Sequence, residues 1–559
     1  MSSLFLRLPT ELIVRILSHL PCPVLLSLTS TSRFFRELID TDTGLQYDVE
    51  LFAAAMLHNP APEARYTLAE CLRLLKSREH AWHRLEFSTV LEIPVPHPPS
   101  SIYDLTGGIF LLGESYSRTL PTWRPTDATR HVDLRAALLS SGTYDVFDRP
   151  WRRIDVKSKT MDVGIAAQEH DLMAIVTYDF LNANQFLAEM KVHLIKISTG
   201  EYHPAASQPV IDLPRMPFLP GNCSVSIEIV GDTLGVLFNL SRFLHGLGAG
   251  PAIKFFLYNW KTGKMRFSKT ADGPEYNAFC FLSPDVIVLP NASQSSLELY
   301  SLTSPTSDAA EPAELEITCS LALPRVAPNA VIHRIWCRAE PNALATRVGT
   351  FASAPFFSDP AQAIIIFNVV AQDMNDGMLH YLSFVVHRAA LLAHLPAPPT
   401  SPPSSPSPSP PPVTEWAAWG PRVCLWIDGD ALAIRWITVT CGQRFVVVRR
   451  ESPKPLQVYD FNARAVRRRH ADARAAGRLV RESAHSESAV DPWNGARTLF
   501  VRRATLLSTI FEEPVVSELP YAITETIEEY EYESVMMDEG VLIGVEVRIW
   551  SCRVALWFY

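Results

Sequence analysis

Apolar residues in the first 90 positions recur every three or four residues, which is the spacing of one face of an α-helix. The first stripe covers residues 12–20 and ends at a pair of prolines, and two more follow over residues 25–39 and 45–56. A fourth begins at Thr67, where a threonine followed three residues later by Glu70 forms a capping box. The pattern therefore predicts an all-α N-terminal module.

After Pro94 the pattern changes to short runs of β-branched and aromatic residues separated by Gly, Pro, Asn and Asp. Such runs predict strands, and residues 192–200 and 255–263 share one form: a strand followed by a polar turn ending in Gly. The irregular repeat is compatible with four-stranded blades of a β-propeller, about seven of them, with six or eight left open. We therefore expect an α+β multidomain chain, in which a small all-α module precedes a large all-β propeller domain.

Proline is over-represented, with 44 copies where roughly 28 are expected at about 5% usage. Ten of them lie within residues 396–412, which read PAPPTSPPSSPSPSPPP. This composition favours polyproline II and cannot build a core, so we predict a disordered loop over residues 396–413 between two strands. Four Ser-Pro pairs leave open a second interpretation, a docking or phosphorylation site.

The formal net charge of −9 gives no reason to expect nucleic acid or an anionic membrane as a partner. Nine cysteines occur singly and without a CxxC pair, which disfavours a disulfide framework and a zinc site. We therefore expect an intracellular protein, in the cytoplasm, the nucleus or both. The N-terminus carries charges at Arg7, Glu11 and Arg15, unlike a signal peptide, and no apolar run of about 18 residues predicts a membrane span.

The chain contains no sequence motif that would indicate catalysis, a metal or a cofactor. Its sixteen histidines include no HExxH, and no GxSxG nucleophile motif occurs. Residues 246–250 are glycine-rich but lack the lysine of a phosphate-binding loop, so we interpret them as a turn. We therefore predict no catalytic residue, no cofactor and no metal.

Residues 6–40, LRLPTELIVRILSHLPCPVLLSLTSTSRFFRELID, resemble the F-box. The likeness consists of Leu-Pro-x-Glu, a helix with Ile and Leu at set steps, a proline break, Leu-x-x-Leu and Ser-Arg-Phe-Phe. Thr31 and Phe35 depart from the family, which often has Val and Trp at these positions. By this resemblance the residues that bind the adaptor are Leu8, Pro9, Glu11, Leu12, Ile16, Leu20, Leu25, Leu28, Ser32 and Phe35.

The resemblance implies an F-box at residues 4–42 that binds a Skp-type adaptor and, through it, a cullin. Residues 43–92 are similar to the helical linker of F-box-like proteins common in mushroom-forming fungi, with Trp82 as an interdomain core residue. Residues 93–559 would form the propeller-like domain that binds an unknown protein substrate. Two alternatives stay open: a scaffold without ligase function, and a propeller enzyme, for which no buried carboxylates are evident in register at the central channel.

Two charged segments follow each other near the C-terminus. Residues 444–503 contain thirteen arginines and one lysine against six acids, and residues 512–539 contain ten acids. We expect the two segments to pair within the fold. As an alternative, Arg467, Arg468 and Arg469 would bind an acidic or phosphorylated substrate peptide, because guanidinium groups pair with phosphate in a bidentate manner. A nuclear-targeting role for these arginines is a weaker possibility.

Overall fold

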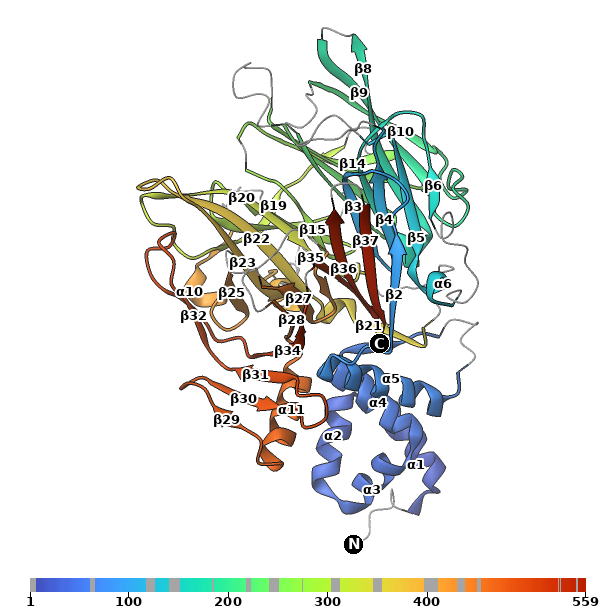
Figure 1. Ribbon diagram of the computed structural model, residues 1–559, viewed down its shortest axis with the longest axis vertical. Helices are drawn as coiled ribbons and strands as arrows, with labels where there is room; N and C mark the ends of the chain where they lie inside the picture. Colours follow the sequence, from blue (N-terminus) through green and yellow to red (C-terminus); the bar gives the residue numbers. More distant parts are fainter. Residues whose placement is uncertain are drawn as a thin grey trace, which may run out of the picture.

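Helices gather at the N-terminal end of the molecule, below a ring of β-sheets (Figure 1). The computed structural model describes residues 7–60, 66–116, 126–139, 151–182, 185–217, 223–240, 251–273, 275–302, 312–344, 354–396, 411–429, 438–449, 454–530, 532, 534–548 and 551–558. Within these residues the N-terminal module contains the helices α1 (Thr10–Leu17), α2 (Cys22–Thr31), α3 (Arg33–Thr41), α4 (Thr43–Ala54) and α5 (Leu68–Arg84).

Two of the predicted helices end earlier than their apolar stripes. The stripe over residues 25–39 is divided at Ser32, whose extended backbone (φ −152°, ψ 137°) interrupts the helix between α2 and α3. The stripe over residues 45–56 ends at Ala55, whose left-handed φ of 53° terminates α4 and places Met56 in the short strand β1 (Met56–His58). The capping box of α5 is confirmed, since the Thr67 side chain accepts from the Glu70 amide while the Glu70 carboxylate accepts from Thr67.

The described strands form seven sheets of four or more strands, which follow one another along the chain and are numbered here as blades; the four strands that make up each blade are antiparallel. Blade 1 consists of β3 (Pro99–Thr106), β4 (Ile109–Glu114), β5 (Ala128–Asp133) and β6 (Arg152–Ile154), and blade 2 of β7 (Lys159–Ala166), β8 (Leu172–Asn182), β9 (Gln185–Lys196) and β10 (Val210–Pro217). Blade 3 consists of β11 (Ser224–Val230), β12 (Thr233–Asn239), β13 (Ile253–Asn259) and β14 (Lys264–Ala271), and blade 4 of β15 (Cys280–Ser283), β16 (Val286–Asn291), β17 (Ser296–Ser301) and β19 (Ile317–Ala322). Blade 5 consists of β20 (Ala330–Arg338), β22 (Ile364–Asp373), β23 (Leu379–His387) and β25 (Cys424–Asp428). Blade 6 consists of β26 (Thr440–Cys441), β27 (Arg444–Val448), β28 (Pro455–Asp460) and β34 (Tyr521–Glu529). Blade 7 consists of β35 (Ser534–Asp538), β36 (Val541–Arg548), β37 (Ser551–Phe558) and β2 (Thr89–Pro94).

The blades close into a ring through the two ends of the β domain. β2, which directly follows the helical module, pairs with the C-terminal strand β37 from Thr89–Phe558 to Pro94–Arg553. First strands of neighbouring blades lie against each other, as β3 does with β7 and with β35. Apolar clusters fill the spaces between successive blades, so strands such as β12 and β16 are buried along their whole length. This arrangement is a β-propeller, and the predicted fold class is confirmed.

Smaller elements decorate the ring. They are the strands β18 (Ala313–Glu314), β21 (Phe356–Ser358), β24 (Val413–Thr414), β32 (Ala504–Leu506) and β33 (Val515–Ser517), and the short helices α6 (Leu134–Leu139), α7 (Ala167–His170), η2 (Pro360–Gln362), α9 (Arg388–Leu392) and α10 (Trp416–Trp419). β21 pairs with β1 of the helical module, so one two-stranded sheet joins the module to the propeller.

Blade 6 carries a large extension, which we call the basic arm (residues 462–503). It contains α11 (Ala463–Ala475), β29 (Val480–Arg481), β30 (Ser486–Val490) and β31 (Arg497–Val501), and its strands continue the blade 6 sheet beyond β34. One face of α11 packs on this sheet through Val466 and Ala473, which meet Phe500. In Figure 1 the arm lies beside the helical module.

Two predicted boundaries fall within or beside strands. The expected start of the propeller at residue 93 lies inside β2, so the propeller already begins at Thr89. Of the proline-rich segment, residues 397–410 lie outside the described residues, while Val413 forms part of β24 and pairs in parallel with Ser320 of β19.

Candidate interaction surfaces

The F-box helices bury one set of apolar residues in a core of their own. Its centre consists of Ile13, Leu17, Leu25, Leu38, Ile39 and Leu45. Three residues predicted to bind the adaptor, Leu20, Leu28 and Phe35, are half-buried against this core. Leu25, also predicted as an adaptor contact, is only 1% exposed and therefore stabilises the core. Ser32, likewise half-buried, is the residue that breaks the helix between α2 and α3.

A second set of apolar residues in the same helices faces outward. Leu12 and Ile16 are four residues apart and therefore lie on one side of α1, and Leu8 precedes the helix; the three side chains are 46%, 42% and 37% exposed. Pro9 and Glu11 beside them are exposed as well. Because about two-fifths of each side chain is exposed, a partner that buries the rest would gain about 0.6–1.4 kcal/mol for each one. This side of α1 is therefore a candidate protein-binding surface.

Three exposed apolar residues of this region were not predicted from the sequence. Val24 and Leu26 of α2 and Phe34 of α3 are each about two-fifths exposed. The F-box motif does not single them out, and the apolar stripe of the predicted second helix runs through Leu25 and Leu28 instead. Only the break at Ser32, which the sequence did not reveal, decides which positions of α2 and α3 face outward.

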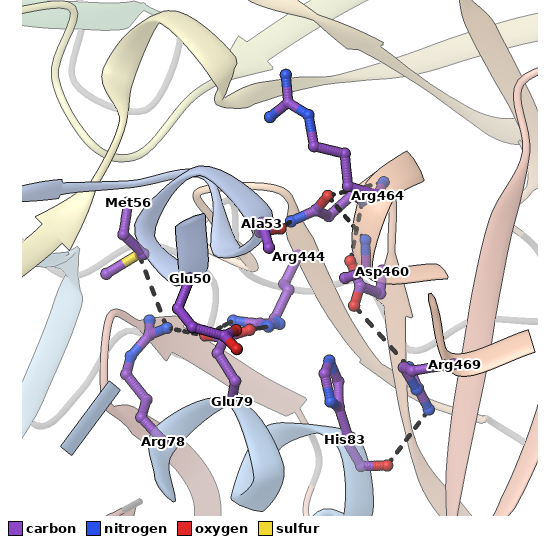
Figure 2. A network of polar contacts seen from close by, with 12 residues as sticks. Glu50, Ala53, Met56, Arg78, Glu79, His83, Arg444, Asp460, Arg464 and Arg469 are labelled. Atoms are coloured by element: carbon purple, nitrogen blue, oxygen red, sulfur yellow. Dashed lines mark hydrogen bonds and ion pairs between the residues drawn. The ribbon is translucent and has the colours of Figure 1, made fainter. Parts of the chain in front are cut away.

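The predicted substrate-binding arginines lie on α11, and two of them contact the helical module; Figure 2 shows Arg469 beside His83 of α5. Arg468 forms an ion pair with Glu50 of α4 at 2.9 Å. Arg469 is largely buried, donates to the His83 carbonyl of α5 at 3.3 Å, and burial lowers its pKa to about 10. Arg467 is exposed. Two of the three arginines thus hold the fold together, and the third faces solvent.

A buried ion network joins α5 to the propeller (Figure 2). The Glu79 carboxylate accepts from Arg78 at 2.5 Å and from Arg444, at the start of β27, at 2.6 Å. Arg78 also donates to the carbonyl of Glu539 in blade 7 at 2.6 Å. Burial opposes ionisation of Glu79, but the two guanidinium groups outweigh it and hold the pKa of Glu79 below its usual value.

Apolar and aromatic contacts reinforce this junction. Trp82, predicted to be an interdomain core residue, is buried in a cluster of propeller side chains, and the Arg444 guanidinium lies 5.2 Å from the centre of its ring. The Arg464 guanidinium stacks on Phe52 of α4 at 3.6 Å. Asn462 caps α11 and also donates to the Ala53 carbonyl at 2.8 Å. The helical module and the propeller are therefore in close, specific contact.

The expected pairing of the basic and acidic segments is found at a single place among the described ion pairs, Arg449 with Glu525 at 3.8 Å. Other arginines of the basic segment pair instead with acids of the helical module or of the arm itself: Arg444 with Glu79, Arg468 with Glu50, Arg497 with Glu482 and Arg502 with Glu487. The main electrostatic partner of the basic segment is therefore the helical module together with the arm.

The central channel contains a cluster of buried charged groups, which corrects the expectation that none would be in register. Arg338 of β20 pairs at 2.8 Å with Asp104 of β3 and with Glu340, and Glu228 of β11 lies 3.8 Å away. Burial and the neighbouring carboxylates raise the pKa values of Glu340 and Glu228 to about 7. Sequence reasoning missed the cluster because Asp104, Glu228 and Arg338 come from different blades and are separated from one another by more than 100 residues.

The carboxylates of this cluster bond to groups of the channel itself. Thr106 donates to Glu340 at 3.0 Å, and Arg338 supplies the charge that partly balances three acids. At the channel end near Glu539 a small hollow is lined by Glu169, Glu340 and Asn342 among others. We interpret the cluster as a polar core that holds the first strands of blades 1, 3 and 5 together, and we assign it no catalytic role.

Within the described part of the chain no group of three potential ligands suited to a metal ion is found. None of the described helices combines the length and the apolar character needed to cross a membrane. The side chains of eight of the nine cysteines are described, and all eight are free thiols.

Comparison with known proteins identifies the N-terminal module. Residues 5–45 match the F-box-like family, a range that overlaps the predicted F-box. Among solved structures the chain is similar to the C-terminal WD40 domain of Sif2 (TM-score 0.25, 9% identity, 79% of this chain and 99% of that chain) and to Kluyveromyces lactis Hsv2p (TM-score 0.22, 9% identity, 75% and 96%). It is also similar to the RRP9 WD40 repeats (TM-score 0.22, 8% identity, 52% and 82%). No curated protein matches the chain.

The order of the sheets and their closure through β2 and β37, rather than these distant similarities, define the propeller. F-box-like domains and propellers are typically non-catalytic interaction modules, so the chain falls in the class of modular protein-interaction proteins. More particularly, it is an F-box protein with a propeller domain.

Proposed function

We propose that this chain is the substrate-recognition subunit of a Skp–cullin–F-box ubiquitin ligase. In this proposal the F-box helices bind a Skp-type adaptor and through it a cullin, while the propeller binds a protein substrate in the cytoplasm or the nucleus. The observation that carries the proposal is the set of exposed apolar side chains formed by Leu12 and Ile16 of α1 and by Leu8 just before it, within a segment that matches the F-box-like family. Such a set is stabilised only when a partner covers it.

The chemical contribution of the chain would be proximity. Holding a substrate lysine near the charged ubiquitin-conjugating enzyme makes the transfer effectively intramolecular, which raises the effective concentration of the lysine. The contacts of Glu79 with Arg444 and of Glu50 with Arg468 support this role, because they keep the propeller in one orientation relative to the F-box. A substrate bound to the propeller would therefore be presented at a set distance from the adaptor.

The adaptor interaction is tested by replacing Leu12 and Ile16 with Ala in the full chain and measuring affinity for a purified Skp-type adaptor. These residues are more than two-fifths exposed, so the double variant is expected to fold normally and to bind about 100-fold more weakly, as for two interface residues that each contribute about 1.4 kcal/mol. Leu507→Ala is the matched control, because Leu507 is an exposed leucine (77%) outside the F-box. Equal affinity of the double variant and the control would contradict the proposal.

Ligase function is separated from a scaffold function by a second experiment. Proximity labelling with the full chain as bait identifies proteins that bind the propeller, and each is then tested for ubiquitin transfer in a complex reconstituted with adaptor and cullin. The proposal predicts transfer that disappears with Leu12→Ala and Ile16→Ala. A bound protein that is retained without receiving ubiquitin would indicate the scaffold alternative.

A further inference from the structure

A bulge in β34 projects a short segment from blade 6. Two steps along β28, from Gln457 to Pro455, match four steps along β34, from Glu525 to Glu529. The extra residues of β34 therefore leave the regular pairing, and Ile527, which lies among them, is 67% exposed. A bulge turns side chains away from the direction that a regular strand would give them, so this part of β34 is available to a partner.

The turn between β30 and β31 carries a second exposed apolar side chain beside the bulge. Trp493 in this turn is 80% exposed, the highest value among the large apolar residues that the structure describes. Gly495, two positions further on, lies against Ile527, because a Cβ atom at Gly495 would be only 2.5 Å from the Ile527 Cδ1 atom. The turn and the bulge therefore form one surface. We call it the bulge surface and define it by its exposed residues Trp493, Ile527, Glu528 and Glu529.

The turn is fixed against the helical module. The Asp491 carboxylate accepts from the Trp493 amide at 2.9 Å and forms an ion pair with Arg84 of α5 at 3.2 Å. The Asn494 side chain donates to the Arg84 carbonyl at 2.6 Å. The backbone of Trp493 is therefore ordered before any partner binds, which lowers the entropic cost of an interaction at this side chain. Tryptophan is also among the residues that contribute most to binding when a partner buries them.

The bulge surface carries a local excess of negative charge. Glu528 accepts from the Tyr530 hydroxyl at 2.9 Å, and neither Glu528 nor Glu529 forms an ion pair with a described side chain. Residues 525–533 contain five glutamates, and residues 504–547 contain no lysine or arginine. The net charge of the whole chain is −9, so the local charge and the overall charge both attract a cationic partner.

The cations near this surface do not neutralise it. Arg84 and Arg497, next to the turn, are already paired with Asp491 and Glu482. Lys454, whose carbonyl accepts from the amide that follows the bulge, is a single half-buried lysine against two exposed glutamates. The surface therefore offers unpaired carboxylates beside exposed apolar side chains.

We propose that the bulge surface binds a segment of the protein substrate that is rich in lysine or arginine and carries a large apolar residue. This inference rests on the proposed function and names the class of substrate. The cationic side chains would pair with Glu528 and Glu529 and stack on Trp493, because an indole ring attracts cations to its face. The apolar residue would cover Ile527. Since the turn is attached to α5, the bound segment would lie beside the helical linker.

The test measures binding of labelled peptides to the full chain by fluorescence polarisation, without the adaptor, at 50 and 300 mM salt. The probe is a flexible glycine–serine peptide in which lysines flank a pair of leucines. Glu528→Gln with Glu529→Gln is expected to weaken binding of this probe about tenfold at 50 mM salt and much less at 300 mM, where exposed charges are screened. Trp493→Ala should weaken binding about tenfold at both salt concentrations.

Two control variants match these changes elsewhere in the ring. Glu314→Gln with Glu316→Gln removes two exposed glutamates, and Leu507→Ala removes an apolar side chain that is 77% exposed. Both controls should bind the probe like the wild type. Two control peptides, one with glutamate in place of lysine and one with serine in place of leucine, should bind much more weakly than the probe.

The inference is overturned if the wild type does not bind the probe, or if the bulge variants bind it as tightly as the control variants. Equal binding of the serine peptide would overturn it as well, since attraction by charge alone would then account for the result. The same variants are also measured with a purified Skp-type adaptor, which all of them should bind like the wild type. A wild type that binds the probe but not the adaptor would refute the proposed function and leave the bulge surface as a binding site for basic segments. A wild type that binds the adaptor but not the probe would refute only the bulge surface.

Discussion

Replacing Glu79 with Gln should loosen the helical module from the propeller. Glu79 lies between Arg78 and Arg444, and its side chain is only 13% exposed, as those of the two arginines are 12% and 10% exposed. The glutamine keeps the size of the side chain but removes the charge. Two largely buried guanidinium groups then lose their counter-charge, and this loss, more than the missing hydrogen bonds, determines the expected effect.

The magnitude follows from the burial of the network. Removing one partner of a buried ion pair costs about 3–5 kcal/mol, and the partial exposure of this network places the cost near the lower end. A cost of about 3 kcal/mol corresponds to roughly a 100-fold increase in the population of the opened junction. The double variant Glu79→Gln with Arg444→Met should recover part of this loss, because it leaves one unpaired charge instead of two.

Hydrogen exchange detected by mass spectrometry measures this opening directly. Amides of α5, which carries Glu79 and Trp82, should exchange about 100-fold faster in Glu79→Gln, while amides of blades 2 and 3 keep their wild-type rates. Glu482→Gln removes the exposed pair with Arg497 and serves as the control, with little expected change. Exchange of α5 within about threefold of the wild type would refute the view that the network holds the junction closed.

Three further predictions concern the channel, the arm and the linker. The pKa of Glu340 is raised to about 7, so the folded protein favours the protonated form. Its contribution to stability is therefore lost as the pH rises from about 4.5 to 7. Because Glu340→Gln stays neutral, the Tm of this variant minus that of the wild type should increase between pH 5 and pH 8. Asn462→Ala removes the cap of α11 and should cost about 1 kcal/mol, measured as faster amide exchange in the first turn of α11. Leu75→Ala leaves a cavity at a fully buried position of α5 and should cost about 2–5 kcal/mol, seen as a lower calorimetric Tm; an unchanged Tm would contradict the packing described for the linker.

Much of the helical module could be predicted from the sequence, because helices depend on neighbours three and four residues away. The capping box at Thr67 and the apolar stripe of α1 are both local patterns, and both are found in the structure. The break at Ser32 could not be predicted, since its flanks continue the apolar periodicity and its extended backbone follows from how α2 and α3 pack. The packing of α2 and α3 also buries Leu25, which the sequence predicted to contact the adaptor, and leaves Val24 exposed.

The class of the β domain could also be predicted from the sequence, whereas the partners of its charged residues could not. Alternating strands and turns predict four-stranded units, and these units are the blades. The role of Arg469, however, depends on His83, which is 386 residues away in the chain. Likewise, Asp104 of β3, Glu228 of β11 and Arg338 of β20 look like unrelated charged residues in three strands until the ring brings them together.

The sequence by itself therefore determined the local elements and the F-box motif, because both are encoded within short stretches of chain. The tertiary structure decided which apolar residues of the F-box remain exposed, how β2 closes the ring with β37, and that arginines of the basic segment such as Arg444 and Arg468 pair with the helical module. The physical reason is that burial and ion pairing depend on distances between side chains, and closing the ring brings residues hundreds of positions apart within 3 Å of each other.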